Sequence, residues 1–218
     1  MSEETTHGHQ GQRVVTTGVP LASATAAMVM VHGRGATAES ILELASEFSA
    51  DGLVFLAPQA RGQTWYPNSF LAPIPSNEPW LSSALAVLGE LCGTLETDGP
   101  GLERTILLGF SQGACLTLEF AARNARRYGG IAGLTGGLIG PQGTPRHYEG
   151  SFAETPVFLG CSDVDPHIPR ERVEETSQVL ARMGARVTTR IYPGMGHTVN
   201  RDEVEAVRQM VREMTNLG

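Results

Sequence analysis

Apolar and polar positions follow two different periods along the chain. Short, continuous apolar runs predict strands that are buried on both faces of a parallel sheet; they occupy residues 26–31, 53–57, 104–110, 129–136 and 155–162. Between these runs, apolar residues recur at helical spacing; these segments are 37–48, 80–95, 112–125 and 169–184. Strand and helix therefore alternate, which predicts an α/β fold with a mostly parallel central sheet and helices on both faces.

The two ends of this pattern carry further elements. Residues 12–18 predict an antiparallel edge strand, and residues 185–192 alternate as an edge strand does. Thr37 is the expected N-cap of the first helix. Asn200 and Glu203 have the spacing of a capping box, so the last helix is expected to start there.

The N-terminal segment MSEETTHGHQGQ contains no apolar run, so we do not expect a signal peptide. We expect residues 1–12 to be a mobile tail, with His7 and His9 solvated, and residues 13–218 to form a single α/β domain. No segment reaches the roughly 20 apolar residues that a membrane-spanning helix needs.

Composition excludes several classes of partner. Hydrophobic residues make up 41% and charged residues 18% of the 218 positions, as in ordinary globular proteins. The net charge of −7 disfavours nucleic acid and anionic membranes, because their phosphates would be repelled. Cys92, Cys115 and Cys161 are odd in number and lie in apolar surroundings, so we expect reduced thiols and a cytoplasmic protein. A monomer and a homodimer are both compatible with the sequence.

One short motif carries candidate chemistry. The stretch GFSQGAC places Ser111 between Gly109 and Gly113, at the junction of an apolar strand and a helix. This is the nucleophile-elbow pattern, in which a sharp turn exposes the serine hydroxyl. A loop of glycine and serine without chemistry is the alternative, so the motif needs support from other residues.

Other polar residues follow the ends of neighbouring strands, where α/β sheets bind their ligands. A serine nucleophile needs an imidazole to accept its proton, a carboxylate to orient that imidazole and N–H donors for the oxyanion. The chain order Ser, Asp, His is that of the α/β-hydrolases. The candidates are His197 as the base, Asp163 or Asp165 as the acid, and the backbone N–H groups of Arg34 and Gln112 as the oxyanion hole, with His32 supporting the glycine loop.

The two aspartates leave the identity of the acid open. Asp163 is closer to the preceding strand, whereas Asp165 precedes Pro166, which restricts its backbone and favours a fixed direction for the carboxylate. We prefer Asp165 and expect Asp163 to be a turn residue. A metal site built from Asp163, Asp165 and His167 is disfavoured because further ligands are missing.

Two long connections, residues 58–79 and 137–154, interrupt the alternation, and loops of this length are often functional. The first contains Trp65, Tyr66 and Phe70 among prolines. These aromatic side chains either line a substrate pocket or fasten the loop to the core. We predict a role in the pocket.

The stretches VHGRGA, LGFSQGAC, DPHIP and YPGMGH resemble the phospholipase/carboxylesterase family of α/β-hydrolases, over about residues 26–215. The resemblance implies an α/β-hydrolase fold with Ser111, Asp165 and His197 as the triad, Arg34 and Gln112 N–H groups as the oxyanion hole, and no metal or organic cofactor. Family thioesterases usually have an apolar residue in place of Arg34, and their loop differs from TWYPNSF. These differences favour a serine carboxylesterase acting on small to medium esters.

Two alternatives remain at this point. A thioesterase or a lysophospholipase would use the same triad, because the acyl-transfer chemistry is nearly the same. A non-catalytic small-molecule-binding protein on this scaffold belongs to a different class; such proteins often lose a triad member, and none is lost here.

Overall fold

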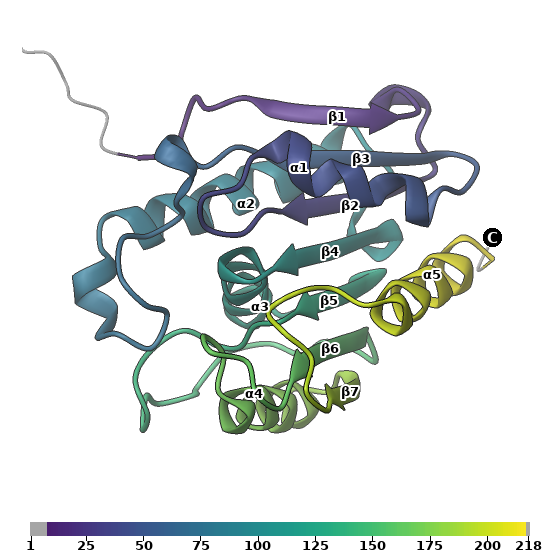
Figure 1. Ribbon diagram of the computed structural model, residues 1–218. Helices are drawn as coiled ribbons and strands as arrows, with labels where there is room; N and C mark the ends of the chain where they lie inside the picture. Colours follow the sequence, from purple (N-terminus) through teal and green to yellow (C-terminus); the bar gives the residue numbers. More distant parts are fainter. Residues whose placement is uncertain (1–7, 217–218) are drawn as a thin grey trace, which may run out of the picture.

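Seven strands form one sheet in the order β1-β3-β2-β4-β5-β6-β7 in the computed structural model, which describes residues 8–216 (Figure 1). β1 pairs antiparallel with β3, and every other neighbouring pair is parallel. The strands are β1 Val14–Gly18, β2 Ala26–Val31, β3 Leu53–Pro58, β4 Thr105–Phe110, β5 Gly130–Leu134, β6 Pro156–Ser162 and β7 Arg186–Tyr192.

Helices cover both faces of this sheet. α1 and α5 pack on one face, and α2, α3 and α4 pack on the other (Figure 1). The helices are α1 Ala38–Leu42, α2 Trp80–Thr97, α3 Gln112–Arg123, α4 Arg170–Arg182 and α5 Arg201–Thr215. β2 shows why its run is continuously apolar: Met28 and Met30 join the core on the α1 side, while Val29 and Val31 join the core on the α3 side.

Most of the predicted elements are confirmed, including the antiparallel edge strand β1 and the edge strand β7. The helix predicted over residues 37–48 is only partly right. α1 ends at Leu42, and a 3₁₀-helix continues over Glu43–Phe48. The spacing of apolar residues shows only which face of a segment is buried. Over two turns a 3₁₀-helix buries nearly the same face as an α-helix, so the spacing could not distinguish the two.

Both predicted N-caps are present. Thr37 Oγ1 accepts a hydrogen bond from the Ser40 N–H at 3.2 Å. At the start of α5, Asn200 Oδ1 accepts from the Glu203 N–H at 2.9 Å, and the Glu203 carboxylate accepts from the Asn200 N–H at 2.8 Å. The capping box therefore fixes where the chain enters α5, directly after the loop that carries His197.

The prediction of a mobile tail is wrong for residues 8–12, and residues 1–7, including His7, lie outside the described residues. His9 is only 1% exposed. The ring Nε2 donates to the Trp65 carbonyl at 2.8 Å and Nδ1 accepts from the Arg61 N–H at 3.0 Å, while the His9 backbone N–H donates to Ser83 Oγ at 2.7 Å. A polar segment is expected to be solvated, so its composition gave no sign of this contact. The imidazole can nevertheless be buried because both of its ring nitrogens are hydrogen-bonded.

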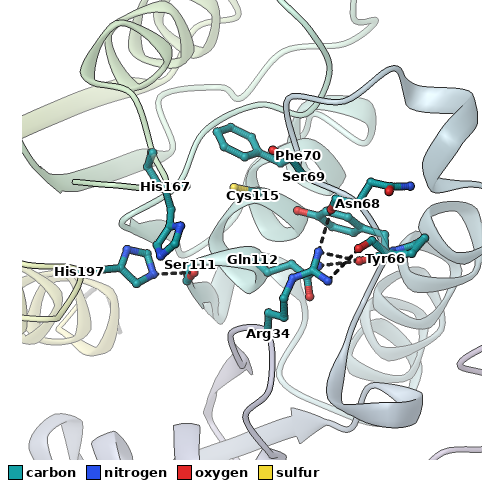
Figure 2. Close-up of a pocket in the computed structure, with 12 residues that line it drawn as sticks. Arg34, Tyr66, Asn68, Ser69, Phe70, Ser111, Gln112, Cys115, His167 and His197 are labelled. Carbon is teal, nitrogen blue, oxygen red and sulfur yellow. Dashed lines mark hydrogen bonds between the residues drawn. The ribbon is translucent and has the colours of Figure 1, made fainter. Parts of the chain in front are cut away.

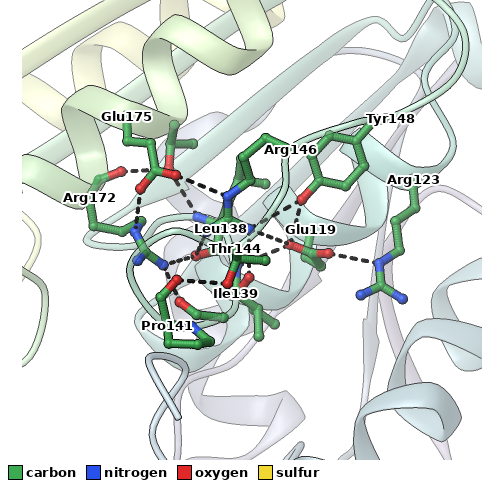
Figure 3. Close-up of polar contacts among 12 residues, drawn as sticks. Glu119, Arg123, Leu138, Ile139, Pro141, Thr144, Arg146, Tyr148, Arg172 and Glu175 are labelled. Atoms are coloured by element: carbon green, nitrogen blue, oxygen red, sulfur yellow. Dashed lines mark hydrogen bonds and ion pairs between the residues drawn. The ribbon is translucent and has the colours of Figure 1, made fainter. Parts of the chain in front are cut away.

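The second long connection is held by a buried ionic network (Figure 3). Glu119 of α3 and Arg146 of the connection are 2% and 7% exposed. Glu119 pairs with Arg123 at 2.7 Å, and Glu175 of α4 pairs with Arg146 at 3.1 Å and with Arg172 at 2.8 Å. Three guanidinium groups therefore share two carboxylates behind the carboxyl ends of the strands.

Candidate active site

Ser111 lies at the tip of a sharp turn between β4 and α3. Its φ of 55° and ψ of −120° are strained for a residue with a side chain. A Cβ on Gly109 would lie 2.3 Å from the Gly113 carbonyl oxygen, and a Cβ on Gly113 would lie 2.2 Å from the carbonyl oxygen of Val31. Both glycines are therefore needed for the turn to pack, and the turn presents the serine hydroxyl at the sheet edge.

Ser111, His197 and Asp165 form a hydrogen-bonded chain across three loops. His197 Nε2 lies 2.8 Å from Ser111 Oγ (Figure 2), and His197 Nδ1 lies 2.8 Å from Asp165 Oδ2. A carboxylate only accepts hydrogen bonds, so Nδ1 carries the proton and the Nε2 lone pair faces the serine. The Asp165 side chain is fully buried, while His197 is 22% exposed. The imidazole is thus held between the serine hydroxyl and the carboxylate, as in a Ser-His-Asp triad.

The Asp165 carboxylate is held by its own loop as well as by His197. Oδ1 accepts the N–H groups of His167 at 2.8 Å and Ile168 at 2.9 Å. Burial alone would raise the pKa of Asp165, but the hydrogen bonds from His197 and from the two N–H groups outweigh it and lower that pKa. Asp163 instead accepts the Gly194 N–H at 2.8 Å. The geometry thus favours Asp165 as the partner of the imidazole and gives Asp163 a bond within the loops.

The glycine-rich loop after β2 is fastened by His32. The His32 ring is fully buried; Nδ1 lies 2.8 Å from the Gly33 carbonyl oxygen, and Nε2 accepts the Ala60 N–H at 3.1 Å. Because Nε2 accepts a backbone N–H, the proton lies on Nδ1, which donates to the Gly33 carbonyl; burial lowers the pKa of His32, which favours this neutral form. Among residues 8–216, neither the Arg34 N–H nor the Gln112 N–H has a hydrogen-bond acceptor. The Gln112 N–H begins α3, where helix N–H groups favour negative charge.

The three aromatic residues of the 58–79 loop have different roles. Tyr66 and Phe70 line a cavity of about 410 Å³ in front of Ser111. The prediction that Trp65 lines the pocket is wrong. Trp65 is fully buried, its Nε1–H donates to the His32 carbonyl at 2.9 Å, and its ring lies 5.3 Å from the ring of His9. A large aromatic side chain packs most stably in the core when its N–H finds an acceptor there.

Two side chains join this loop to the candidate oxyanion hole. The Gln112 side chain accepts the Trp65 N–H at 2.9 Å and donates to the Tyr66 carbonyl at 2.8 Å. The Arg34 guanidinium donates to three successive carbonyls, at distances of 2.7–2.9 Å; they belong to Tyr66, Pro67 and Asn68 (Figure 2). From the sequence, only the backbone N–H groups of Arg34 and Gln112 were predicted to take part in the site. No local pattern indicates a bond between side chains and carbonyls about 30–50 residues away.

The remaining wall of the cavity includes residues that the sequence analysis did not single out for this role. His167 lies edge-on to His197, with ring centroids 4.9 Å apart. Asn68, Ser69, Cys115 and Ile168 also line the cavity. Burial raises the pKa of the Cys115 thiol to about 12, so this sulfur is not a thiolate nucleophile at neutral pH.

The fold and this arrangement define an α/β-hydrolase, and comparison with known proteins agrees. The chain belongs to the phospholipase/carboxylesterase family, whose sequence profile matches residues 12–215, so the resemblance seen in the sequence is confirmed. A solved phospholipase/carboxylesterase from Dyadobacter fermentans is 45% identical, with a TM-score of 0.89 over 92% of this chain and 96% of that chain.

Two curated relatives are more distant. Acyl-protein thioesterase 1 of Gibberella zeae is 32% identical over 51% of this chain, and a putative carboxymethylenebutenolidase of Salmonella typhi is 28% identical over 75%. The chain spans 48% and 64% of the length of these relatives. It is thus a member of an esterase and thioesterase family of hydrolases.

Residues 8–216 contain neither a membrane-spanning helix nor a cluster of metal-ligating side chains. None of their helices is both long and apolar enough to cross a membrane. Within the same range, no group of three or more His, Cys, Asp or Glu side chains is placed to hold a metal ion.

Proposed function

We propose that this protein is a serine carboxylesterase that hydrolyses small to medium carboxylic esters through an acyl-enzyme. The observation that carries the proposal is the 2.8 Å contact between His197 Nε2 and Ser111 Oγ, continued at 2.8 Å to Asp165. The lowered pKa of Asp165 keeps a negative charge beside the imidazole at neutral pH, which stabilises the imidazolium that forms when the serine proton is transferred.

In the proposed reaction, Ser111 Oγ attacks the ester carbonyl carbon while His197 Nε2 takes the hydroxyl proton. The carbonyl oxygen becomes an oxyanion, which the N–H groups of Arg34 and Gln112 stabilise. The tetrahedral intermediate then collapses, the C–O bond to the alcohol breaks, and His197 returns the proton to the departing alcohol. A water molecule, deprotonated by His197, releases the acid from Ser111 in the same way.

The size and polarity of the cavity support the proposed substrate range. A volume of about 410 Å³ is near the lower end for small-molecule sites, and arginine, asparagine, serine and histidine line it beside Phe70 and Ile168. These features favour a short acyl chain over a long lipid. The proposal includes a cytoplasmic location, which rests on three cysteines that are free and buried.

A fluorophosphonate probe tests the nucleophile directly. We expect one label per chain, mapped to Ser111, and no label in Ser111→Ala. The same substitution should lower kcat for p-nitrophenyl acetate by about 10⁶, as loss of the serine does in other triad hydrolases. Labelling or turnover that survives Ser111→Ala contradicts the proposal, and a folded wild-type protein without turnover favours the binding-protein alternative.

A series of p-nitrophenyl esters from acetate to palmitate, with an acyl-CoA and a lysophospholipid, separates the esterase from the thioesterase and lysophospholipase alternatives.

A further inference from the structure

The cavity wall formed by Arg34 carries a positive charge that no carboxylate compensates. All three hydrogen bonds of the guanidinium go to backbone carbonyl oxygens, which have no net charge. Arg34 forms no ion pair with another residue in the range 8–216. Arginine has five N–H donors, so two of them have no acceptor among these residues. A substrate with an anionic group would supply the missing partner.

The Tyr66 hydroxyl is a second poorly satisfied group at the same cavity. Tyr66 lines the cavity and is 1% exposed, and in the described part of the chain its hydroxyl has no nitrogen or oxygen partner; the side chain it meets is the Cys115 thiol, a weak acceptor. Figure 2 shows the Tyr66 ring with its hydroxyl directed toward Cys115, and the Arg34 guanidinium beneath the same loop. A buried hydroxyl that meets only a weak sulfur acceptor is poorly satisfied, so a ligand oxygen at this cavity would be a better acceptor for its hydrogen bond.

Arg34 is the only arginine or lysine among the residues that line the cavity. The lining contains arginine and histidine side chains but no aspartate or glutamate. Asp165 is fully buried beneath His197. Behind Phe70, whose ring centroid lies 5.9 Å from the Arg172 guanidinium carbon, three arginines share two glutamates. The Arg34 guanidinium, with no carboxylate beside it in the lining, can therefore attract an anion to this cavity although the chain has a net charge of −7.

We propose that the substrate is an ester whose short acyl chain ends in a carboxylate, that is, a half-ester of a small dicarboxylic acid. Arg34 binds this carboxylate through its free N–H groups, and the Tyr66 hydroxyl donates a hydrogen bond to one of the carboxylate oxygens. Hydrogen bonds between a guanidinium and a carboxylate are among the stronger ones in proteins, which suits a specificity contact. The inference rests on the proposed esterase function and adds the charge of the substrate to it.

The test compares two esters of the same acid that differ in one charge: monomethyl glutarate and dimethyl glutarate. Initial rates are followed by acid release at constant pH with the wild type, Arg34→Met, Arg34→Lys and Tyr66→Phe. We expect the wild type to have the higher kcat/KM for monomethyl glutarate. Arg34→Met, which keeps the backbone N–H, should lower the ratio of the two kcat/KM values by about tenfold or more, the effect of losing a hydrogen bond to a charged group.

The control variants separate charge from support of the loop. Arg34 also holds residues 66–68, so its loss lowers both rates, but only loss of the charge changes their ratio. Arg34→Lys should retain most of the preference, and Tyr66→Phe should reduce the ratio by a few-fold. Added salt should lower the wild-type ratio by screening the exposed Arg34, which tests the charge without any substitution.

The outcomes distinguish this inference from the proposed function. Cleavage of dimethyl glutarate with no preference for the half-ester, or a preference that survives both Arg34→Met and high salt, overturns the anionic-substrate proposal and leaves the esterase standing. Failure to cleave either ester, together with no fluorophosphonate label on Ser111, overturns the esterase proposal itself.

Discussion

On the side of Ser111 that carries His197, side chains bond to side chains: the imidazole links the serine hydroxyl to the Asp165 carboxylate at 2.8 Å on each side. On the opposite side, side chains bond to backbone. There the Arg34 guanidinium and the Gln112 amide hold carbonyl and N–H groups of residues 65–68. The first arrangement joins titratable groups and is suited to move a proton, whereas the second fixes the shape of a wall. We therefore expect substitutions on the two sides to have different consequences.

The largest effect is expected at the carboxylate on the histidine side. Asp165→Asn should leave the fold intact and lower kcat by about 10⁴, because an amide would hold the imidazole in the wrong tautomer. Asp163→Asn is the matched control: its carboxylate bonds to the Gly194 N–H instead, so we expect a loss of about tenfold or less. Kinetics of both purified variants with one ester decide the matter, and the reverse ordering would move the role of the acid to Asp163.

The second largest effect is expected for Trp65 on the loop side. Its substitution should change the stability of the protein and not its preference among esters. Trp65→Ala should lower the free energy of unfolding by about 3–5 kcal/mol, because it leaves a cavity in the core and removes the bond to the His32 carbonyl. Denaturant unfolding measures this loss. The ratio of kcat/KM for short and long esters should not change, since Trp65 does not line the cavity.

Phe70→Ala provides the contrast for Trp65, because Phe70 lines the cavity and its removal should shift that ratio toward longer esters. A shift of equal size in Trp65→Ala would show that the loop transmits changes in its core to the pocket. The two sides would then be less independent than the contacts indicate.

The smallest of these effects is the change of the free energy of unfolding with pH. On the histidine side this free energy is expected to fall as the pH rises, and on the loop side to rise. Glu203, which caps α5 after the His197 loop, is fully buried, and burial raises its pKa from 4.5 to about 7. As the pH rises, the Glu203 carboxyl loses its proton at a lower pH in the unfolded chain than in the folded protein. Between about pH 4.5 and about pH 7 this difference lowers the free energy of unfolding, by up to about 3 kcal/mol. Denaturant unfolding across this range should show a weaker fall in Glu203→Gln than in the wild type.

On the loop side, burial lowers the pKa of His9 and of His32 below 6.5. The unfolded chain therefore takes up protons first as the pH falls, and this side loses stability on acidification below about 6.5. Glu203→Gln should leave that acid limb unchanged. A substitution that alters both limbs equally would contradict the separation of the two sides.

Much of the fold and of the candidate site followed from local sequence patterns. Continuous apolar runs identified the strands of the parallel sheet, because both faces of such strands are covered. Ser111 between two glycines predicted a sharp turn, and both glycines prove to have no space for a side chain. The order of strands in an α/β sheet places their carboxyl ends at one edge, so serine, aspartate and histidine were expected near one another, and they lie within hydrogen-bond distance.

Other features depended on contacts between segments far apart in the chain. The mobile tail was expected because residues 8–12 are polar, yet His9 is buried against Trp65, 56 positions away. Trp65 was assigned to the pocket because it belongs to a cluster of aromatic residues in the 58–79 loop, but in the structure Trp65 lies in the core and only Tyr66 and Phe70 of this cluster line the cavity. Sequence neighbours share a loop but not a direction, and only packing decides which side chain points where.

The sequence by itself determined the elements whose causes are local: the apolar period of each strand and helix, the caps at Thr37 and Asn200, and the glycines around Ser111. Tertiary structure alone decided which aspartate meets His197 and where the charge of Arg34 lies. Both questions concern hydrogen bonds across more than 30 positions, with the Arg34 guanidinium reaching the carbonyl oxygens of residues 66–68. Their geometry is set by how the loops pack over the sheet edge, because a hydrogen bond tolerates only a few tenths of an ångström.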